Sequence, residues 1–225
     1  MNKKQIFSIF IVLAIITTLL LGFWQIKRSE QKNTLNHAIK YTFEHPLAYN
    51  EEKSQPYQTY IISGFYDFQK QILLGPRTFN NQIGMYVYTI FVTDNNEHLL
   101  VNRGFVSKNN SMNIKLAGKS DDLTIKIFSL GKPKQSWYSA KNSPHKNQWV
   151  SLNFAEIESF FKLDLGQHYF KEIVNPEQKI DSKIIASFTE SYQIDNIHTK
   201  YIYFWFLFSL TFLIMLVIYV KSKKT

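Results

Sequence analysis

The sequence predicts a membrane protein of the α+β class, in which two transmembrane helices flank a mostly antiparallel, β-rich extracytoplasmic domain. Two observations support this prediction. Long uncharged apolar runs lie near both ends of the 225-residue chain, and about 20 such residues are enough to cross a bilayer. Between these runs, short segments are rich in β-branched and aromatic side chains, which is typical of strands.

The two apolar runs divide the chain into five parts. These are a cytoplasmic N-terminus (1–5), a first transmembrane helix (6–24), an extracytoplasmic β-rich domain with one or two helices (25–200), a second transmembrane helix (201–220) and a cytoplasmic tail (221–225). The first run has no small-residue cleavage site after it, so we interpret it as an uncleaved anchor rather than a signal peptide.

The orientation of the spans follows from positive charge. Lys221, Lys223 and Lys224 follow the second run, whereas only Lys200 closely precedes it. Because cytoplasmic flanks carry the excess of lysine and arginine, we expect both termini in the cytoplasm. No presequence rich in arginine and serine precedes the first run, which favours the bacterial inner membrane over a mitochondrion. We therefore expect a multi-pass protein whose main domain is periplasmic.

The region between the spans contains a series of strand candidates. Residues 57–68 form the first, with Gly64 as a bulge, and residues 71–74 are its expected hairpin partner, closed by Gly75-Pro76. Further strands are expected at 83–92, 98–107, 123–130, 148–153 and 169–174, and a helix is expected at 154–163. These elements predict a mostly antiparallel sheet or a small open barrel.

Composition narrows the function classes. The formal net charge is +9, but five lysines lie at the termini, which leaves 21 basic against 17 acidic residues between the runs. This excess is too small for a nucleic-acid-binding groove. The chain has no cysteine, so thiolate metal sites, a cysteine nucleophile and disulfides are excluded. It also lacks the common nucleophile motifs, and we predict that it is not an enzyme.

His198 lies at the polar entrance of the second apolar run. On a helix it shares a face with Tyr201 and Trp205, at offsets of three and seven. An ionisable ring at membrane depth is a functional-site hypothesis. The alternative is an interfacial belt, in which these side chains only anchor the span among the lipid headgroups.

Trp24 and Gln25 leave the membrane on the side at which His198 enters it. If the two helices pair, which Gly22 would permit by letting the backbones approach, these groups meet at one interface. Arg28 follows Gln25 on the same helix face, so we expect the helix to continue beyond the bilayer. The alternative is that these side chains form only a solvated polar stripe.

Arg103 is the notable charged residue of the β-rich region. In strand alternation it shares a face with Leu99, Val101 and Phe105. A guanidinium among apolar neighbours needs an anionic partner, because it cannot lose its proton. That partner is either an internal aspartate or glutamate, or a carboxylate on a ligand or another protein. Gly104 then allows a bulge or a close backbone approach.

Four segments carry a family resemblance. They are Leu21-Gly22-Phe23-Trp24-Gln25-Ile26-Lys27-Arg28 with Lys32, Gly75-Pro76-Arg77 followed by Gly84, Val101-Asn102-Arg103-Gly104-Phe105-Val106, and Asn196-Ile197-His198 with Tyr201 and Trp205-Phe206. In this order they resemble the Surfeit locus protein one family, the assembly factors of haem–copper cytochrome oxidases. The chain departs from that pattern at Thr89-Ile90, Thr199 and Ile202, which leaves open whether it serves a different oxidase.

The resemblance implies an assembly factor for a haem–copper cytochrome c oxidase that assists haem a insertion into subunit I by transient haem binding at the membrane interface. It implies oxidase subunit I and haem a synthase as partners. His198 is then the expected ligand of the haem iron. The other expected haem-binding residues are Tyr201, Trp205, Trp24, Gln25, Arg28 and Arg103. The alternative is a membrane scaffold that binds an oxidase subunit or haem synthase without holding haem itself.

Overall fold

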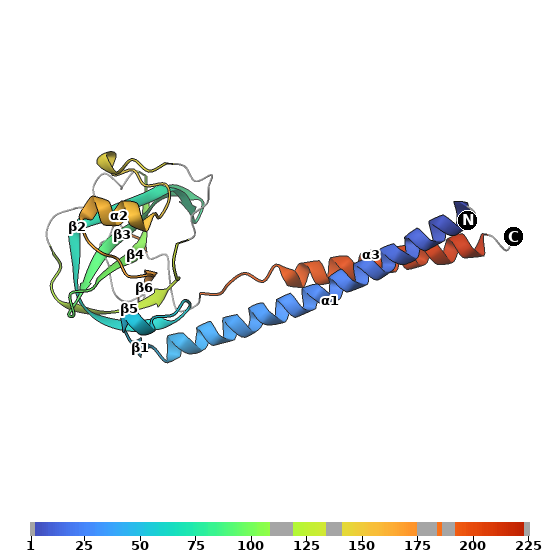
Figure 1. The fold of residues 1–225 in the computed structure, drawn as a ribbon, viewed down its shortest axis with the longest axis horizontal. Coiled ribbons are helices and arrows are strands. Elements are labelled where there is room, and N and C mark those ends of the chain that lie inside the picture. The colour runs from blue at the N-terminus through green and yellow to red at the C-terminus, as the bar shows by residue number, and fades with distance from the viewer. Residues whose placement is uncertain (1–2, 109–118, 134–140, 175–183, 186–191, 223–225) are drawn as a thin grey trace. The chain divides into compact units, whose positions relative to one another are not determined.

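The computed structural model describes residues 3–108, 119–133, 141–174, 184–185 and 192–222. The chain forms two compact units, drawn as ribbons in Figure 1. One unit comprises Met1–Ala38 and Gln193–Thr225, and the other comprises Ile39–Tyr192. The outermost ends of the predicted cytoplasmic segments, residues 1–2 and 223–225, lie outside the described residues.

The first unit contains α1 (Lys3–Glu44) as far as Ala38, together with α3 (His198–Lys221). They run side by side (Figure 1). Each is long and apolar enough to cross a membrane, by length and composition. As expected, α1 continues well beyond the first apolar run, through Glu44.

The second unit is a closed barrel of five strands with a short sixth strand at its edge. The strands are β1 (Leu47–Ala48), β2 (Thr59–Phe79), β3 (Gln82–Thr93), β4 (His98–Ser107), β5 (Leu123–Ser129) and β6 (Tyr169–Ile173). Their order is β1-β2-β3-β4-β6-β5, and β2 also pairs with β5, which closes the sheet on itself. The pairs β1–β2 and β4–β6 are parallel and the others are antiparallel. Short helices complete the unit: η1 (Glu51–Lys53), η3 (Pro144–Lys146) and α2 (Phe154–Phe161).

Strands β3 to β6 confirm the sequence-based predictions to within one residue at each end. The predicted helix at 154–163 is also confirmed as α2, although it ends at Phe161. It ends there because Lys162 adopts the left-handed conformation that commonly terminates a helix. At its start, the Asn153 side chain accepts a hydrogen bond from the Glu156 amide.

Strand β2 differs from its prediction. Residues 57–68 and 71–74 do not form two hairpin strands; they belong to one 21-residue strand that pairs with β3 along its later part. The pairing register shifts between Asp67 and Gln71 and again between Leu74 and Arg77, so extra residues are absorbed as bulges. The chain reverses instead at Asn80 and Asn81, whose positive φ angles suit a two-residue hairpin turn.

Two further strand details are corrected. Gly64 is no bulge: it pairs in register with Thr93, and a Cβ at this position would collide with the Val92 carbonyl oxygen. Residues 148–153 form isolated bridges only. The backbone amides of Val150 and Ser151 instead donate to the Asn142 side chain, so they are unavailable to a sheet.

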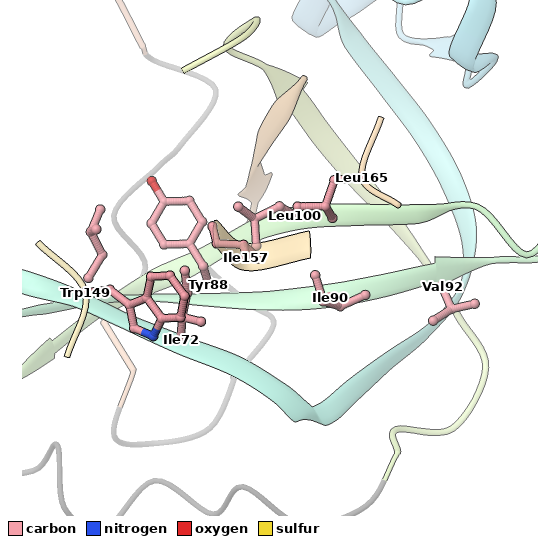
Figure 2. Packing of buried hydrophobic residues seen from close by; sticks show 9 residues of the cluster. Ile72, Tyr88, Ile90, Val92, Leu100, Trp149, Ile157 and Leu165 are labelled. Atoms are coloured by element: carbon pink, nitrogen blue, oxygen red, sulfur yellow. The ribbon is translucent and has the colours of Figure 1, made fainter. Parts of the chain in front are cut away.

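Apolar side chains fill both faces of the curved sheet. One cluster takes residues from all five barrel strands and fills the interior: Tyr60, Ile62, Tyr66, Phe91, Leu99, Val101, Ile127 and Phe170. A second cluster covers the outer face of β2, β3 and β4 beneath α2, and Figure 2 shows its members, including Ile72, Tyr88, Leu100, Trp149 and Ile157. The C-terminal end of α1 joins this unit through Phe43, whose ring packs 5.2 Å from that of Phe128.

Candidate functional site

Aromatic side chains hold α1 against α3 in the apolar part of the helix pair. The Phe206 ring packs on Gly22, where an added Cβ would lie 3.1 Å from it, and edge-on to Phe23 at 5.6 Å. Phe7 and Tyr219 form a second edge-to-face pair at 4.9 Å. The helices therefore pair at Gly22, as expected, but the glycine makes room for a phenyl ring.

The polar entrance of this helix pair brings His198 to Gln25. His198 is the first residue of α3, and its Nδ1 lies 2.7 Å from Gln25 Oε1. Gln25 is 8% exposed. A carboxamide oxygen can only accept, so Nδ1 is the donor in this contact. This contact confirms the expectation that the two groups meet at one interface.

Trp24 and Arg28 complete this cluster. The Trp24 ring lies edge-to-face with the His198 ring at 6.2 Å, and the Arg28 guanidinium lies 5.7 Å from the Trp24 ring centre. Arg28 also donates to Gln31 on the exposed side of α1. The structure thus gathers Trp24, Gln25, Arg28 and His198 in one place.

Tyr201 and Trp205 follow His198 along α3. Tyr201 is half exposed, and its ring and that of Trp205 both contact the Phe204 ring, at 6.5 and 5.3 Å. The indole Nε1 of Trp205 is enclosed and has no hydrogen-bond partner among the described residues. An enclosed N–H group without an acceptor is costly, so Trp205 offers an unused donor.

Small polar side chains beyond Gln25 form a ladder of hydrogen bonds that was not predicted. Ser29 and Thr199 share a hydrogen bond of 3.1 Å between their hydroxyl oxygens. The Asn196 amide nitrogen donates to the carbonyl and hydroxyl oxygens of Ser29, at 3.1 and 3.0 Å, and lies 2.9 Å from Asn33 Oδ1. These bonds fix the backbone that enters α3 just before His198.

The ladder ends at Asn36, which binds the backbone of Ile194 twice. Its Nδ2 donates to the Ile194 carbonyl at 2.9 Å, and its Oδ1 accepts from the Ile194 amide at 2.8 Å. The signal for this ladder is present in the sequence, because Gln25, Ser29, Asn33 and Asn36 lie at offsets of four, eight and eleven. The predicted stripe runs instead from Gln25 through Arg28 onto the neighbouring, exposed face of α1.

Arg103 belongs to the barrel unit. It is 9% exposed, and its guanidinium lies 5.0 Å from the Tyr66 ring centre and 4.9 Å from that of Phe68. The Tyr66 hydroxyl donates to Glu172 at 3.0 Å. Burial raises the pKa of the Glu172 carboxyl, and the Tyr66 hydrogen bond and the Arg103 charge oppose this rise. A carboxylate inside the barrel thus lies within the field of Arg103, which favours the internal partner.

Phe105 does not share the strand face of Arg103, contrary to the prediction. Gly104 pairs with Val87 and Asn102 with Tyr88, so Arg103 is the extra residue of a β-bulge. An inserted residue reverses the alternation, and the Phe105 ring packs against Tyr86 on the outer face. Gly104 meets both expectations, since it lies in this bulge and the Ile185 carbonyl oxygen would be 2.5 Å from an added Cβ.

The cluster around His198 fits a single-ligand haem site. Haem iron takes a neutral imidazole nitrogen as an axial ligand, and the bond to Gln25 leaves Nε2 of His198 as that nitrogen. Trp24 offers an aromatic face and Arg28 a cation. The fit to haem rests on these three side chains, His198, Trp24 and Arg28.

The chain is similar to known proteins over most of its length. The SURF1 family matches residues 12–210. A SURF1-like protein of Rickettsia bellii is 27% identical over 220 residues, covering 96% of this chain and 91% of the relative, and that of Rickettsia conorii is 28% identical over 221 residues with the same coverage. The cytochrome oxidase assembly protein SHY1 of Saccharomyces cerevisiae is 26% identical over 163 residues, covering 66% of this chain and 42% of the yeast protein.

The family match and the two-helix architecture agree with each other. The matched range extends from the first apolar run through the barrel and into α3. It therefore includes both the helix entrance and every strand of the barrel. The chain belongs to the SURF1 family.

Proposed function

We propose that this chain is a cytochrome oxidase assembly factor of the bacterial inner membrane that holds haem a at His198 and delivers it to oxidase subunit I. The observation that carries the proposal is the 2.7 Å hydrogen bond between His198 Nδ1 and Gln25 Oε1. When Nδ1 of a neutral imidazole donates to Gln25, the free lone pair lies on Nε2, the nitrogen that would ligate iron. The name of the yeast relative, a cytochrome oxidase assembly protein, supports the assembly role.

Gln25 acts in this proposal as a positioning residue. Metal-binding histidines commonly donate their second ring N–H to an acceptor that orients the ring and raises its basicity. Gln25 is such an acceptor, and the ladder from Ser29 to Asn36 holds the two chain segments in register around it. A single histidine ligand suits a carrier, because the cargo must also be released.

The remaining site residues have separate proposed roles. Tyr201 and Trp205 extend the apolar contact along α3, and the Trp205 N–H is a donor for a polar group of the cargo. Arg28 is the cation for a propionate. Arg103 lies against Tyr66 and Phe68 inside the barrel, so its proposed role is to stabilise the fold or to bind a partner protein. Haem a synthase and subunit I are the proposed partners, with both termini in the cytoplasm.

The test is the visible spectrum of the detergent-purified protein, co-expressed with the enzymes of haem a synthesis. We expect a Soret band that His198→Ala removes or shifts. Gln25→Leu keeps the ligand but removes the acceptor, so haem affinity should fall by about 10–100-fold. Thr34→Val is the control, because Thr34 lies on the exposed side of the same helix and its hydroxyl donates to the Glu30 carbonyl of that helix.

One outcome tests the hydrogen bond to Gln25, and another separates the carrier from the alternative scaffold. Equal spectra and haem affinities for Gln25→Leu and Thr34→Val would show that the hydrogen bond from His198 to Gln25 has no role in haem binding. Colourless protein in every preparation, together with normal oxidase assembly in a His198→Ala strain, would overturn the carrier. A scaffold that binds an oxidase subunit or haem synthase would then remain.

A further inference from the structure

A row of aromatic rings follows His198 along α3. The ring centroids of Tyr201 and Phe204 lie 6.5 Å apart, and those of Phe204 and Phe208 lie 4.6 Å apart. The row continues to Phe212, whose ring lies 6.1 Å from that of Phe208. These four side chains, Tyr201, Phe204, Phe208 and Phe212, form one connected surface, which we call the aromatic ridge.

The aromatic ridge lies on the same side of α3 as His198. Tyr201, Phe208 and Phe212 follow His198 at offsets of three, ten and fourteen, which a repeat of 3.6 residues brings to one side of a helix. Phe204 borders this stripe through its ring contacts with Tyr201 and Phe208. A chain attached to a ligand at His198 would therefore reach the ridge without crossing the helix.

The faces of the ridge are accessible from the membrane. Tyr201 is 48% exposed, Phe204 is 45% exposed and Phe208 is 43% exposed. The rings of α3 that pack against α1 belong to other residues, Phe206 and Tyr219. The ridge therefore keeps open surface while the two helices are paired.

Contact with lipid does not by itself account for these rings. An interfacial belt would explain Tyr201, but Phe212 lies about 21 Å further along the axis than His198, at 1.5 Å per residue. The exposed apolar side chains of α3 beyond Phe212 have no ring, although they would face the same lipid; they are Leu213, Ile214, Met215, Val217, Ile218 and Val220. The exposed rings are thus concentrated in the part of α3 that begins at His198.

The ridge suits a long, methyl-branched and unsaturated chain. It extends for about 16 Å along the helix axis. Lipid tails are as apolar as the side chains, so selective binding within a membrane depends on van der Waals packing. Rigid rings in contact with one another offer a fixed surface, and an isoprenoid chain with its stiff double bonds loses less conformational entropy on such a surface than a saturated acyl chain does.

We propose that the aromatic ridge holds the farnesyl chain of a haem whose iron is bound by His198, and that it thereby selects haems with such a chain over haem b. This inference rests on the proposed carrier function and names the part of the cargo that determines its selection. A lipid acyl chain is the competing occupant, and the test distinguishes the two.

The test is a visible-spectrum titration of the full chain in lipid nanodiscs with haem b and with haem o. Haem o differs from haem b in carrying a hydroxyethylfarnesyl chain in place of a vinyl group, so the ratio of the two affinities isolates the chain. Haem o should bind more tightly. Phe204→Ala combined with Phe208→Ala should lower this ratio by about threefold to tenfold, the range expected for ring contacts, and leave the affinity for haem b unchanged.

Leu210→Ala combined with Ile214→Ala is the matched control. These side chains have the same spacing of four residues as Phe204 and Phe208 and a similar exposure, 52% and 51%. Their offsets of two and six from Phe208 place them on the other side of α3. The control should keep the affinity ratio of the parent, because partition of the farnesyl chain into lipid is the same for every variant. Circular dichroism checks that each variant is folded.

Three results would overturn the role of the ridge. These are equal binding of haem o and haem b by the parent, an equal loss of both affinities in the Phe204 and Phe208 variant, and an equal fall of the ratio in the control, as expected if acyl chains occupy the ridge. In each case, a Soret band that His198→Ala removes would leave the carrier function standing. A parent that binds neither haem would overturn both proposals.

Discussion

At the scale of single residues, the barrel interior contains a carboxyl group, that of Glu172, whose pKa is set mainly by burial. Glu172 accepts the Tyr66 hydroxyl hydrogen, beside the guanidinium of Arg103, among otherwise apolar neighbours. Burial disfavours the ionised carboxylate, and this effect outweighs the two opposing partners, so the pKa of Glu172 is raised. The folded state therefore binds the Glu172 proton more tightly than the unfolded state does.

This raised pKa sets the sign of a pH dependence. The stabilising contribution of the Glu172 proton is fully present below the unfolded pKa, about 4.3 for a glutamate, and is lost as the pH rises through the raised folded pKa. The melting temperature of the parent relative to Glu172→Gln should therefore fall as the pH rises from 4 toward neutrality. Glu52→Gln, at an exposed carboxylate, is the control for charge removal. A difference that grows with pH would contradict the burial argument.

Gly104 lies where the backbone of Ile185 approaches β4 closely enough to exclude a side chain. Its φ of +143° disfavours any residue with a side chain, and an added Cβ would lie 2.5 Å from the Ile185 carbonyl oxygen. Gly104→Ala should therefore lower the free energy of unfolding by roughly 1–3 kcal/mol from backbone strain, with a further loss from the contact.

Gly166 is the matched control for this substitution. A Cβ there would meet the Glu51 carboxylate oxygen at 2.8 Å, but that atom ends a flexible side chain that can move. Denaturant titrations of the two alanine variants, followed by circular dichroism, should show a clearly larger loss for Gly104→Ala. Equal losses would mean that the close approach of Ile185 does not constrain the strand.

At the scale of elements, the polar ladder between α1 and the entry to α3 explains how His198 is placed. Apolar rings can hold two helices together without fixing their register, whereas the paired amides and hydroxyls match at one register only. The ladder therefore aligns Gln25 with His198. The contact at the site depends on residues up to three turns further along α1.

Engineered cysteines can test this register, because the chain has no cysteine of its own. The Ser29 and Thr199 oxygens lie 3.1 Å apart, so Ser29→Cys with Thr199→Cys should form a disulfide under mild oxidation and lose both free thiols. Arg28→Cys with Thr199→Cys should keep its thiols, because Arg28 is exposed on a different side of α1. A maleimide label counts the thiols. Oxidation of the Arg28 pair but not the Ser29 pair would show a different register.

The elements that the sequence predicted well are those whose pattern is local. Strand β4 and helix α2 have a regular alternation or spacing of apolar side chains, which reports burial directly. The long β2 was predicted as two strands, because its bulges interrupt the alternation while its pairing with β3 continues. The predicted strand face of Phe105 was wrong for the same reason, because one inserted residue at Arg103 moves every later side chain to the opposite face.

The candidate site also has a part that the sequence predicted and a part that it did not. The meeting of Gln25 and His198 was predictable, because span topology alone brings both to one side of the membrane. The ladder at Asn33 and Asn196 was not, because the register of two helices is set by side-chain packing that a sequence does not display. The row of Tyr88, Asn102 and Lys171 across the barrel was not predicted either, because it follows only from the order of β3, β4 and β6.

At the scale of the whole molecule, the division into two units assigns the end of α1 to the barrel. Ile39 and Phe43 are buried within the second unit, and the Phe43 ring packs against Phe128 on β5. The Thr42 hydroxyl also shares a hydrogen bond with Thr59 at the start of β2. The last turns of α1 therefore contribute to the stability of the barrel.

Phe43→Ala should accordingly destabilise the barrel by about 3–5 kcal/mol, the usual cost of truncating a buried phenylalanine. Tyr41→Ala, two residues earlier on the same helix, removes a ring that is 62% exposed and should change stability by no more than about 0.5 kcal/mol. The measurement is denaturant unfolding of residues 39–192, which contain the strands and both cores of the barrel. A cooperative transition in this fragment, shifted strongly by Phe43→Ala and little by Tyr41→Ala, is the expected result. If the two variants unfold alike, the end of α1 is a connector only, and the strands alone determine the stability of the barrel.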